Sequence, residues 1–223
     1  SPMWFLNPVL CTNLTVSGVS TVGHGPNNDG CNPECCTDVL IENCYFDNGD
    51  DCIAVKAGRD EDGWRVGVPC ENIVIRNCTM KDGHGGITVG SEMSGGVRNV
   101  FAENCYLNSP DLERGLRLKT NDHRGGFIKD IYLRNIEIGE VSGAAISIDM
   151  HYPGGTDYAP PEIRNINVES MGCSKADQVF YLDGLSESKI ADVTVINSLF
   201  QNIQTTDKIE DVENLSQINV RRD

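Results

Sequence analysis

The stretch that decides the fold is Asp38-Val-Leu-Ile-Glu-Asn43-Cys44, because its pattern recurs along the chain. The pattern is Asn or Asp, then apolar residues alternating with others, then Asn and a small or apolar residue. Copies begin at residues 13, 38, 72, 99, 130, 165, 192 and 214, the first, sixth and last being weaker. Successive copies start 25, 34, 27, 31, 35, 27 and 22 residues apart. Self-similarity with periods in this range indicates a repeat architecture.

Each copy indicates a short β-strand with one buried face, because apolar residues occupy every second position. Gly, Asn and Pro separate the copies, and no helical periodicity is sustained. One strand per repeat predicts a solenoid in which each coil pairs in parallel with the next, about 4.8 Å away. We therefore predict an all-β fold, a single-stranded parallel β-helix of about eight coils, with residues 1–223 as one domain.

Two other architectures fit less well. A leucine-rich repeat would show a Leu-rich consensus and a helical convex side, and neither is present. An immunoglobulin-like sandwich would need antiparallel hairpins with their tight turn signals, which are also missing.

The composition excludes some partners. The formal net charge of −15 argues against a nucleic-acid partner, which would favour a basic face. No run of about 18 apolar residues exists, so we predict no membrane span. No signal-peptide pattern begins at Ser1, and the first residues resemble the middle of a folded protein, so we expect the natural N-terminus to be absent. An anionic polymer could bind so acidic a chain only at a local cluster of Lys and Arg.

The repeat explains several of the ten cysteines. Cys44, Cys78 and Cys105 occupy one position in three copies, so we predict a column of buried, unpaired thiols. The Asn before each is expected to form a ladder that bonds backbone groups at the corner. A local disulfide or ligand cluster stays open for three residues whose spacing fits neither a zinc site nor a redox motif: Cys31, Cys35 and Cys36.

A second strand follows the repeat strand within each coil. The segment that begins at Gly49 starts 11 residues after Asp38, and the segment that begins at Gly83 starts 11 residues after Asn72. The next two coils offer residues 115–119 and 145–149. Alternation turns their Ile, Leu and Val residues inward and predicts one exposed outer face for three cations: Lys56, Arg117 and Lys119.

The same alignment gathers acidic residues beside these cations. Asp50 aligns with His84, and Asp29 aligns with Asp51 one coil later. Each alone would be an ordinary turn or surface residue, but all share one patch over four successive coils. Paired carboxylates are the apparatus of glycosidases, and Arg and Lys bind carboxylates on a substrate.

Four motifs resemble those of glycoside hydrolase family 28, the polygalacturonases, and they stand in the family's order. They are Asn28-Asp29, Gly49-Asp50-Asp51, Gly83-His84-Gly85 and Arg117-Leu118-Lys119. One departure is Asn27 in the first motif, where the family often has Asn-Thr-Asp. The resemblance extends from about Ser1 to Asp223. It implies a right-handed β-helix of the pectin-lyase type, with further N-terminal coils before Ser1.

The resemblance also implies an activity and residue roles. The activity is inverting hydrolysis of α-1,4-galacturonosyl linkages in polygalacturonate or pectin, without cofactor or metal, by a secreted or periplasmic protein. Asp50 would be the general acid, Asp29 and Asp51 would activate water, and His84 would support the acid. Four residues are our substrate-binding candidates: Arg117 and Lys119 for the galacturonate carboxylate, with Asn28 and Lys56 beside them.

Two segments favour an exo-acting enzyme. Residues 58–65 lengthen a loop before the Gly83 motif and, with residues 90–96, resemble bacterial exo-acting members. Alternatives remain: an endo-polygalacturonase, a rhamnogalacturonan or xylogalacturonan hydrolase, a calcium-dependent pectate lyase, or a non-catalytic β-helix such as an adhesin or phage tail protein. The oligomeric state stays open.

Overall fold

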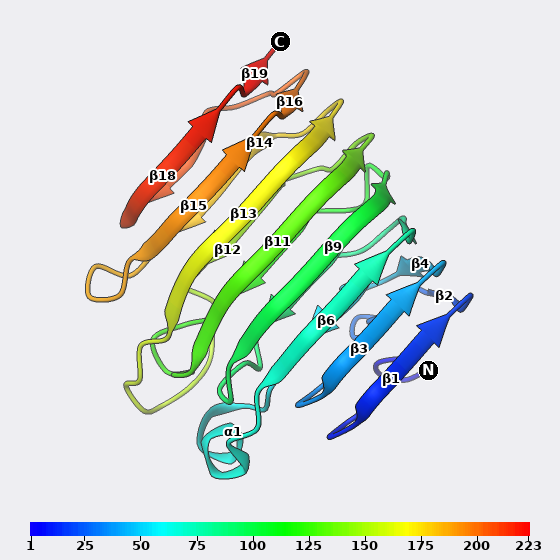
Figure 1. The fold of residues 1–223 in the computed structure, drawn as a ribbon, viewed down its shortest axis with the longest axis vertical. Helices are drawn as coiled ribbons and strands as arrows, with labels where there is room; N and C mark the ends of the chain where they lie inside the picture. Colours follow the sequence, from blue (N-terminus) through cyan, green and yellow to red (C-terminus); the bar gives the residue numbers. More distant parts are fainter.

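The computed structural model describes residues 1–223 and consists almost entirely of parallel strands. Eight strands pair side by side in chain order, with the two termini at opposite ends of the row (Figure 1). They are β1 (Thr12–Ser17), β3 (Thr37–Glu42), β6 (Cys70–Arg76), β9 (Val97–Leu107), β11 (Phe127–Ile138), β13 (Glu162–Cys173), β15 (Ile190–Ile196) and β18 (Val212–Ile218). Each strand coincides with one copy of the sequence repeat, so the predicted solenoid of about eight coils is confirmed.

Five short strands extend this large sheet: β2 (Ser20–Gly23), β4 (Tyr45–Asn48), β7 (Thr79–Met80), β16 (Leu199–Phe200) and β19 (Arg221–Arg222). A second sheet takes one strand from each of six coils. In chain order its strands are β5 (Ile53–Val55), β8 (Ile87–Gly90), β10 (Leu116–Lys119), β12 (Ala144–Asp149), β14 (Gln178–Asp183) and β17 (Lys208–Glu210).

The apolar core lies inside the coils. Ile53 pairs with Ile87, which pairs with Leu116, and all three side chains are buried. The same alternation on the large sheet completes a single cluster of 52 buried residues. Residues between these inner positions point out of the second sheet, and this face carries the predicted polar residues.

Asn and Asp residues mark the corners of the coils because they adopt left-handed backbone angles. The φ angles are 59° at Asp38, 58° at Asn72 and 55° at Asn99. Such angles strain most residues by about 1–2 kcal/mol, and Asn and Asp tolerate them best. Asn72 Nδ2 donates to Asp38 Oδ1 (2.9 Å), and Asn99 Nδ2 donates to Asn72 Oδ1 (3.1 Å). A second ladder follows at the next Asn, where Asn135 donates to Asn104 (3.3 Å). We expected backbone partners, whereas these bonds join side chains.

All ten cysteines are free thiols. Cys44, Cys78 and Cys105 are at most 3% exposed, as predicted for a buried column. A second column joins Cys11, Cys36 and Cys70, in which each of the first two residues donates its backbone N–H to the next sulfur at 3.4 Å. The disulfide left open for Cys31, Cys35 and Cys36 is therefore absent.

The one helix, α1 (Asp60–Val66), projects beside β6 (Figure 1). We expected residues 58–65 to form a loop, and this was wrong. Three acidic residues in the first turn, Asp60, Glu61 and Asp62, complement the helix dipole. Gly67 ends the helix with a left-handed φ of 62°. No helix has the length and apolar character needed to cross a membrane.

Candidate active site

The register of the coils brings three carboxylates together. Gly30 N–H donates to Asp51 O (2.9 Å), which sets Asp29 opposite Asp51. His84 N–H donates to Asp50 O (3.2 Å) and holds the next coil in place. Carboxylate oxygens of Asp29, Asp50 and Asp51 lie within 4.8 Å of one another. The structure thus assembles the acidic cluster that the alignment predicted.

Asp51 is fully buried and paired with two cations. Lys119 Nζ lies 2.7 Å from Asp51 Oδ2, and Arg117 Nη1 lies 3.1 Å from Asp51 Oδ1, which also accepts a hydrogen bond from Thr88 Oγ1 (3.1 Å). Burial alone would raise the pKa of Asp51, but Lys119 and Arg117 outweigh it and lower the pKa below the ordinary value. The site therefore favours the ionised form of Asp51.

Asp29 has the opposite electrostatic environment. Its Oδ2 accepts a hydrogen bond from Asn32 Nδ2 (2.7 Å), and its Oδ1 is buried without a partner in the protein. Burial and the negative charge of Asp51 raise the pKa of Asp29 to about 7, although Lys56 opposes the shift. The carboxylate cluster therefore holds a proton below this pH.

Asp50 is the carboxylate that contacts His84. Their Oδ1 and Nδ1 atoms are 3.1 Å apart, and the Asp50 side chain is 18% exposed. This hydrogen bond raises the pKa of His84. The Nε2 of His84 faces Glu113 Oε1 at 3.9 Å. Asp50 is thus the most accessible of the three carboxyls and has an ionisable partner of its own.

Lys56 lies in the same outward column as Lys119. Its Nζ donates to Gly90 O (3.1 Å) and to Glu92 Oε2 (2.6 Å), and it lies 4.7 Å from the centre of the Trp4 ring. Gly90, between the two lysines, has a φ of 98°, and a side chain there would collide with the Lys119 carbonyl. A glycine at this point therefore lets the two cations approach the same cavity.

The outward face is not exposed, contrary to our expectation. Lys56 and Lys119 are 3% and 5% exposed, because loops cover them. Tyr152 lies over both predicted carboxylate-binding cations, with its ring centre 5.2 Å from Lys119 Nζ and 6.0 Å from Arg117 Cζ. Lys119 thus lines a partly covered pocket, with Arg117 beneath the same tyrosine.

That pocket has a volume of about 230 Å³. Its lining includes Asp29, Asp50, Lys56 and Lys119, together with residues from the loops: Trp4, Asn27, Arg59, Ser91, Glu92, Arg124, Tyr152 and Pro153. We call it the carboxylate cavity. It combines carboxyl groups for proton transfer with cations for an anionic ligand.

A buried arginine holds the loops of this cavity together. Arg124 is 1% exposed, and its Nη1 lies 2.6 Å from Asp60 Oδ1 of α1. Its Nε donates to Ser91 O (3.0 Å), and its carbonyl accepts from Trp64 Nε1 (2.9 Å). The two segments that we associated with exo action, residues 58–65 and 90–96, therefore form one wall.

Asn28 does not line the carboxylate cavity. Its Nδ2 donates to Ser1 O (2.8 Å) and Met3 O (3.0 Å), and its Oδ1 accepts from Gly25 N–H (2.9 Å). These bonds fix the N-terminal segment beside Asp29. The substrate-binding role that we assigned to Asn28 stays a prediction, and its contacts favour a structural role.

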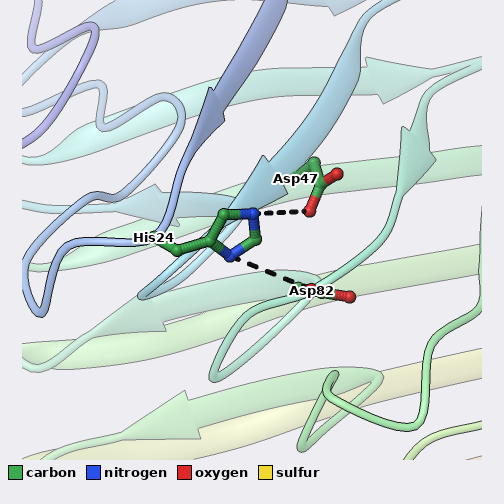
Figure 2. Close-up of side chains that lie close together, drawn as sticks. All are labelled: His24, Asp47 and Asp82. Atoms are coloured by element: carbon green, nitrogen blue, oxygen red, sulfur yellow. Dashed lines mark ion pairs between the residues drawn. The ribbon is translucent and has the colours of Figure 1, made fainter.

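Another histidine lies between two acids of neighbouring coils (Figure 2). His24 Nε2 is 3.3 Å from Asp47 Oδ1, and His24 Nδ1 is 3.8 Å from Asp82 Oδ2. A metal ion would need both carboxylates beside one ring nitrogen, about 2.0–2.1 Å from the ion. Because the acids face different ring nitrogens, the arrangement is that of ion pairs and not of a metal site.

The trio of Asp29, Asp50 and Asp51 also fits a metal poorly. Asp51 already has two cations within 3.1 Å, and these would repel a divalent ion. A third group of acids and a histidine consists of Asp149, His151 and Asp183. It also has a cation beside it, because Lys208 Nζ lies 2.6 Å from Asp183 Oδ2.

Comparison with known proteins assigns the chain to a family. The model for glycosyl hydrolases family 28 matches residues 1–219. The chain belongs to this family. A relative named "Probable polygalacturonase" from Vitis vinifera is 36% identical over 208 residues, which make up 88% of this chain and 41% of the relative. The "Exo-poly-alpha-D-galacturonosidase" of Dickeya chrysanthemi is 27% identical over 207 residues, 79% of this chain and 34% of that protein.

A solved exopolygalacturonase structure has the same fold. The exopolygalacturonase from Thermotoga maritima superposes with a TM-score of 0.96 at 37% identity, covering 100% of this chain and 50% of that chain. The chain is therefore a parallel β-helix of family 28 that spans half or less of the length of these relatives.

Several residues that line the candidate site were not predicted from the sequence. Trp4, Arg124 and Tyr152 all line the carboxylate cavity. Tyr152 follows the β12 strand by three residues, and this position was a usable signal. Trp4 and Arg124 lie in segments outside the repeat, so their register could not be counted.

Proposed function

We propose that this chain hydrolyses α-1,4-galacturonosyl linkages of galacturonan and acts from the chain end. The observation that carries the proposal is a cluster in which three carboxyls meet two cations, Arg117 and Lys119, and which borders the carboxylate cavity through Asp29, Asp50 and Lys119. Glycoside hydrolysis uses the carboxyls, and an anionic sugar explains the cations. Family membership and the names of the relatives support the same activity. A substrate of this kind suggests a secreted or periplasmic protein.

The three carboxyls have different roles in this proposal. Asp50, exposed and bonded to His84, donates the proton to the leaving oxygen. Asp51 stays ionised beside its cations and stabilises positive charge that develops on the sugar. Asp29 Oδ1 is buried without a partner in the protein; it orients the attacking water and takes up its proton in the form in which the proton of the cluster lies on Asp50.

The carboxyl spacing differs from our expectation. Inverting glycosidases usually separate the two carboxyls by roughly 6.5–9.5 Å, whereas oxygens of this trio lie within 4.8 Å. Inversion still fits because no member is a free nucleophile. Both oxygens of Asp51 are paired with cations, and Asp29 acts on the water and not on the sugar. We therefore propose that water attacks the sugar.

Exo action is supported by the wall beside the cavity. Arg124 bonds to α1 through Asp60 and to the next loop through Ser91, and Arg59 and Ser91 line the cavity. A volume of about 230 Å³ is small against the usual range of about 300–1,000 Å³ for ligand pockets. A cavity of this volume holds about one sugar unit, and we infer that this unit is the end of the chain.

The test is a product profile on polygalacturonate. Galacturonate or a short product of constant size from the first minutes, with slow loss of viscosity, is expected. A mixture of long oligomers at early times would show endo action. No release of reducing sugar from any galacturonan would refute the proposed function. Proton NMR of the first product distinguishes inversion from retention by the anomer that is formed.

A further inference from the structure

The outward column of the small sheet changes charge between β10 and β12. Lys119 pairs with Asp149, Asp149 with Asp183, and Asp183 with Glu210. On the other side Lys119 pairs with Gly90, and Lys56 follows the Val55–Val89 pair. Cations therefore mark the column up to β10, and acids mark it from β12 onward. Most of these charges have partners, Lys119 with Asp51, Lys56 with Glu92 and Asp183 with Lys208, so the contrast in charge depends on the residues that line the cavities above the column.

A second cavity, of about 520 Å³, lies on the acidic side. Tyr152 and Pro153 line both this cavity and the carboxylate cavity, so the two are neighbours across one short loop. Its ionisable lining residues are Asp122, Glu187, Asp211, His123 and His151, and no Lys or Arg lines it. We call it the acidic cavity. Its volume lies within the range for small-molecule sites.

The carboxylates of the acidic cavity are accessible and partly fixed. Glu187 accepts hydrogen bonds from Ser186 Oγ (2.8 Å) and Tyr158 OH (2.9 Å), which orient it. Asp122 lies 3.1 Å from His123 Nε2, and its side chain is 38% exposed. Carboxylates accept hydrogen bonds from hydroxyl groups, whereas they repel another carboxylate. The lining therefore suits an uncharged sugar and not an anionic one.

We propose that the acidic cavity binds an uncharged sugar unit of the pectic chain, next to the galacturonate held above Lys119. The unit is either a galacturonate whose carboxyl is methyl-esterified or a neutral sugar, and the two share hydroxyl groups without charge. This inference rests on the proposed function. It makes the chain an enzyme for partly esterified or neutral-sugar-bearing galacturonan, with Glu187, Asp122 and Asp211 as determinants of specificity.

Binding to the full chain with the Asp50→Asn substitution tests the proposal. The probes are trigalacturonate, the two trigalacturonates that carry a methyl ester on one terminal unit, and the analogues with a neutral galactose there. One of the uncharged-terminus probes should bind at least about fivefold more tightly than trigalacturonate, the factor expected when about 1 kcal/mol of repulsion is removed. A preference for the ester over galactose, or the reverse, identifies the natural unit.

Charge reversal supplies the control. Glu187→Lys and Asp211→Lys, each added to Asp50→Asn, should shift the preference toward trigalacturonate. Glu213→Lys makes the same charge change on the exposed β18 strand of the large sheet and should leave the preference unaltered. Tighter binding of trigalacturonate than of every uncharged probe, or equal shifts in all three variants, would overturn the inference. The proposed function fails separately, if the unsubstituted chain cleaves neither polygalacturonate nor its partly esterified form.

Discussion

Lys119 Nζ lies 2.7 Å from Oδ2 of Asp51, and the two side chains are only 7% and 0% exposed. Since an unpaired charge at such depth is very costly, each residue makes the other tolerable. The pair therefore links the stability of the β-helix to the chemistry of its site.

Lys119→Met should lower the free energy of unfolding by about 3 kcal/mol, because Asp51 loses a buried partner while Arg117 remains. Adding Asp51→Asn should recover part of this loss. Urea denaturation measures both. The comparison variant is Arg65→Ala, whose ion pair with Asp62 is 73% exposed on each side and should matter little. Equal losses for the buried and exposed pairs would contradict this account.

Asp29→Asn should stabilise the protein at alkaline pH. The folded-state pKa of Asp29, about 7, lies above the ordinary value of 3.8, so folding favours its protonated form. Its contribution to stability is fully present below about pH 3.8 and is lost as pH rises through about 7. The variant cannot ionise, so its advantage at pH 8 should reach up to about 4 kcal/mol and vanish near pH 4. Thermal unfolding across pH measures it, and Asp51→Asn should show the opposite sign at pH 8.

Hydrolysis should fail as pH rises through about 7. The raised pKa of Asp29 places a proton in the carboxylate cluster below that pH, and the leaving oxygen needs a proton from this cluster. The decline should appear in kcat/KM measured from pH 4 to 9. A rate that stays constant between pH 6 and 9 would rule out this dependence.

Asp50→Asn should abolish turnover of polygalacturonate with little change in substrate binding. Asn has nearly the shape of Asp but cannot donate a proton to the leaving oxygen. A nitrophenyl galacturonide has a leaving group that needs less acid help, so this variant should recover much more activity on it than Asp29→Asn or Asp51→Asn. Equal defects of the three variants on both substrates would refute the division of roles.

Asn99→Ala should destabilise the solenoid by about 1–2 kcal/mol, because alanine is strained at a φ of 55° and the bond to Asn72 is lost. Asn99→Gly loses the same bond but adopts this angle without strain, so it should be less harmful. Chemical denaturation distinguishes the two. If glycine proved worse than alanine, the left-handed angle would not explain the Asn repeat.

Counting along the repeat predicted the parts of the site that lie on strands. The offset of 34 residues that aligns Ile53 with Ile87 also sets Asp50 beside His84, because every coil repeats the same backbone path. Hydrophobic alternation likewise predicted that Arg117 and Lys119 point out of the sheet.

Loops that leave the coil defeated this reasoning. The sequence repeat does not include Tyr152 or Arg124, so it could not predict their contacts with Lys119 and Asp60. The burial of Lys119 was therefore not predicted. Asn28 shares a motif with Asp29, yet neighbouring residues of a turn point in different directions, and its amide bonds to Ser1 and Met3. The sequence repeat predicts which residues of neighbouring coils lie side by side. Which loops cover those residues depends on tertiary contacts that the repeat does not encode.

The buried cysteines can be used to detect where neighbouring coils of the solenoid separate locally. Nine of the ten cysteines lie between Cys11 and Cys105, in the coils that carry the candidate site, and only Cys173 lies beyond them. All but Cys11 are buried, and burial raises the pKa of thiols such as Cys31 and Cys173. An alkylating reagent can therefore modify the nine buried cysteines only after a coil separates from its neighbours. Mass spectrometry of the labelled peptides would then give the order in which the coils open, without any added probe.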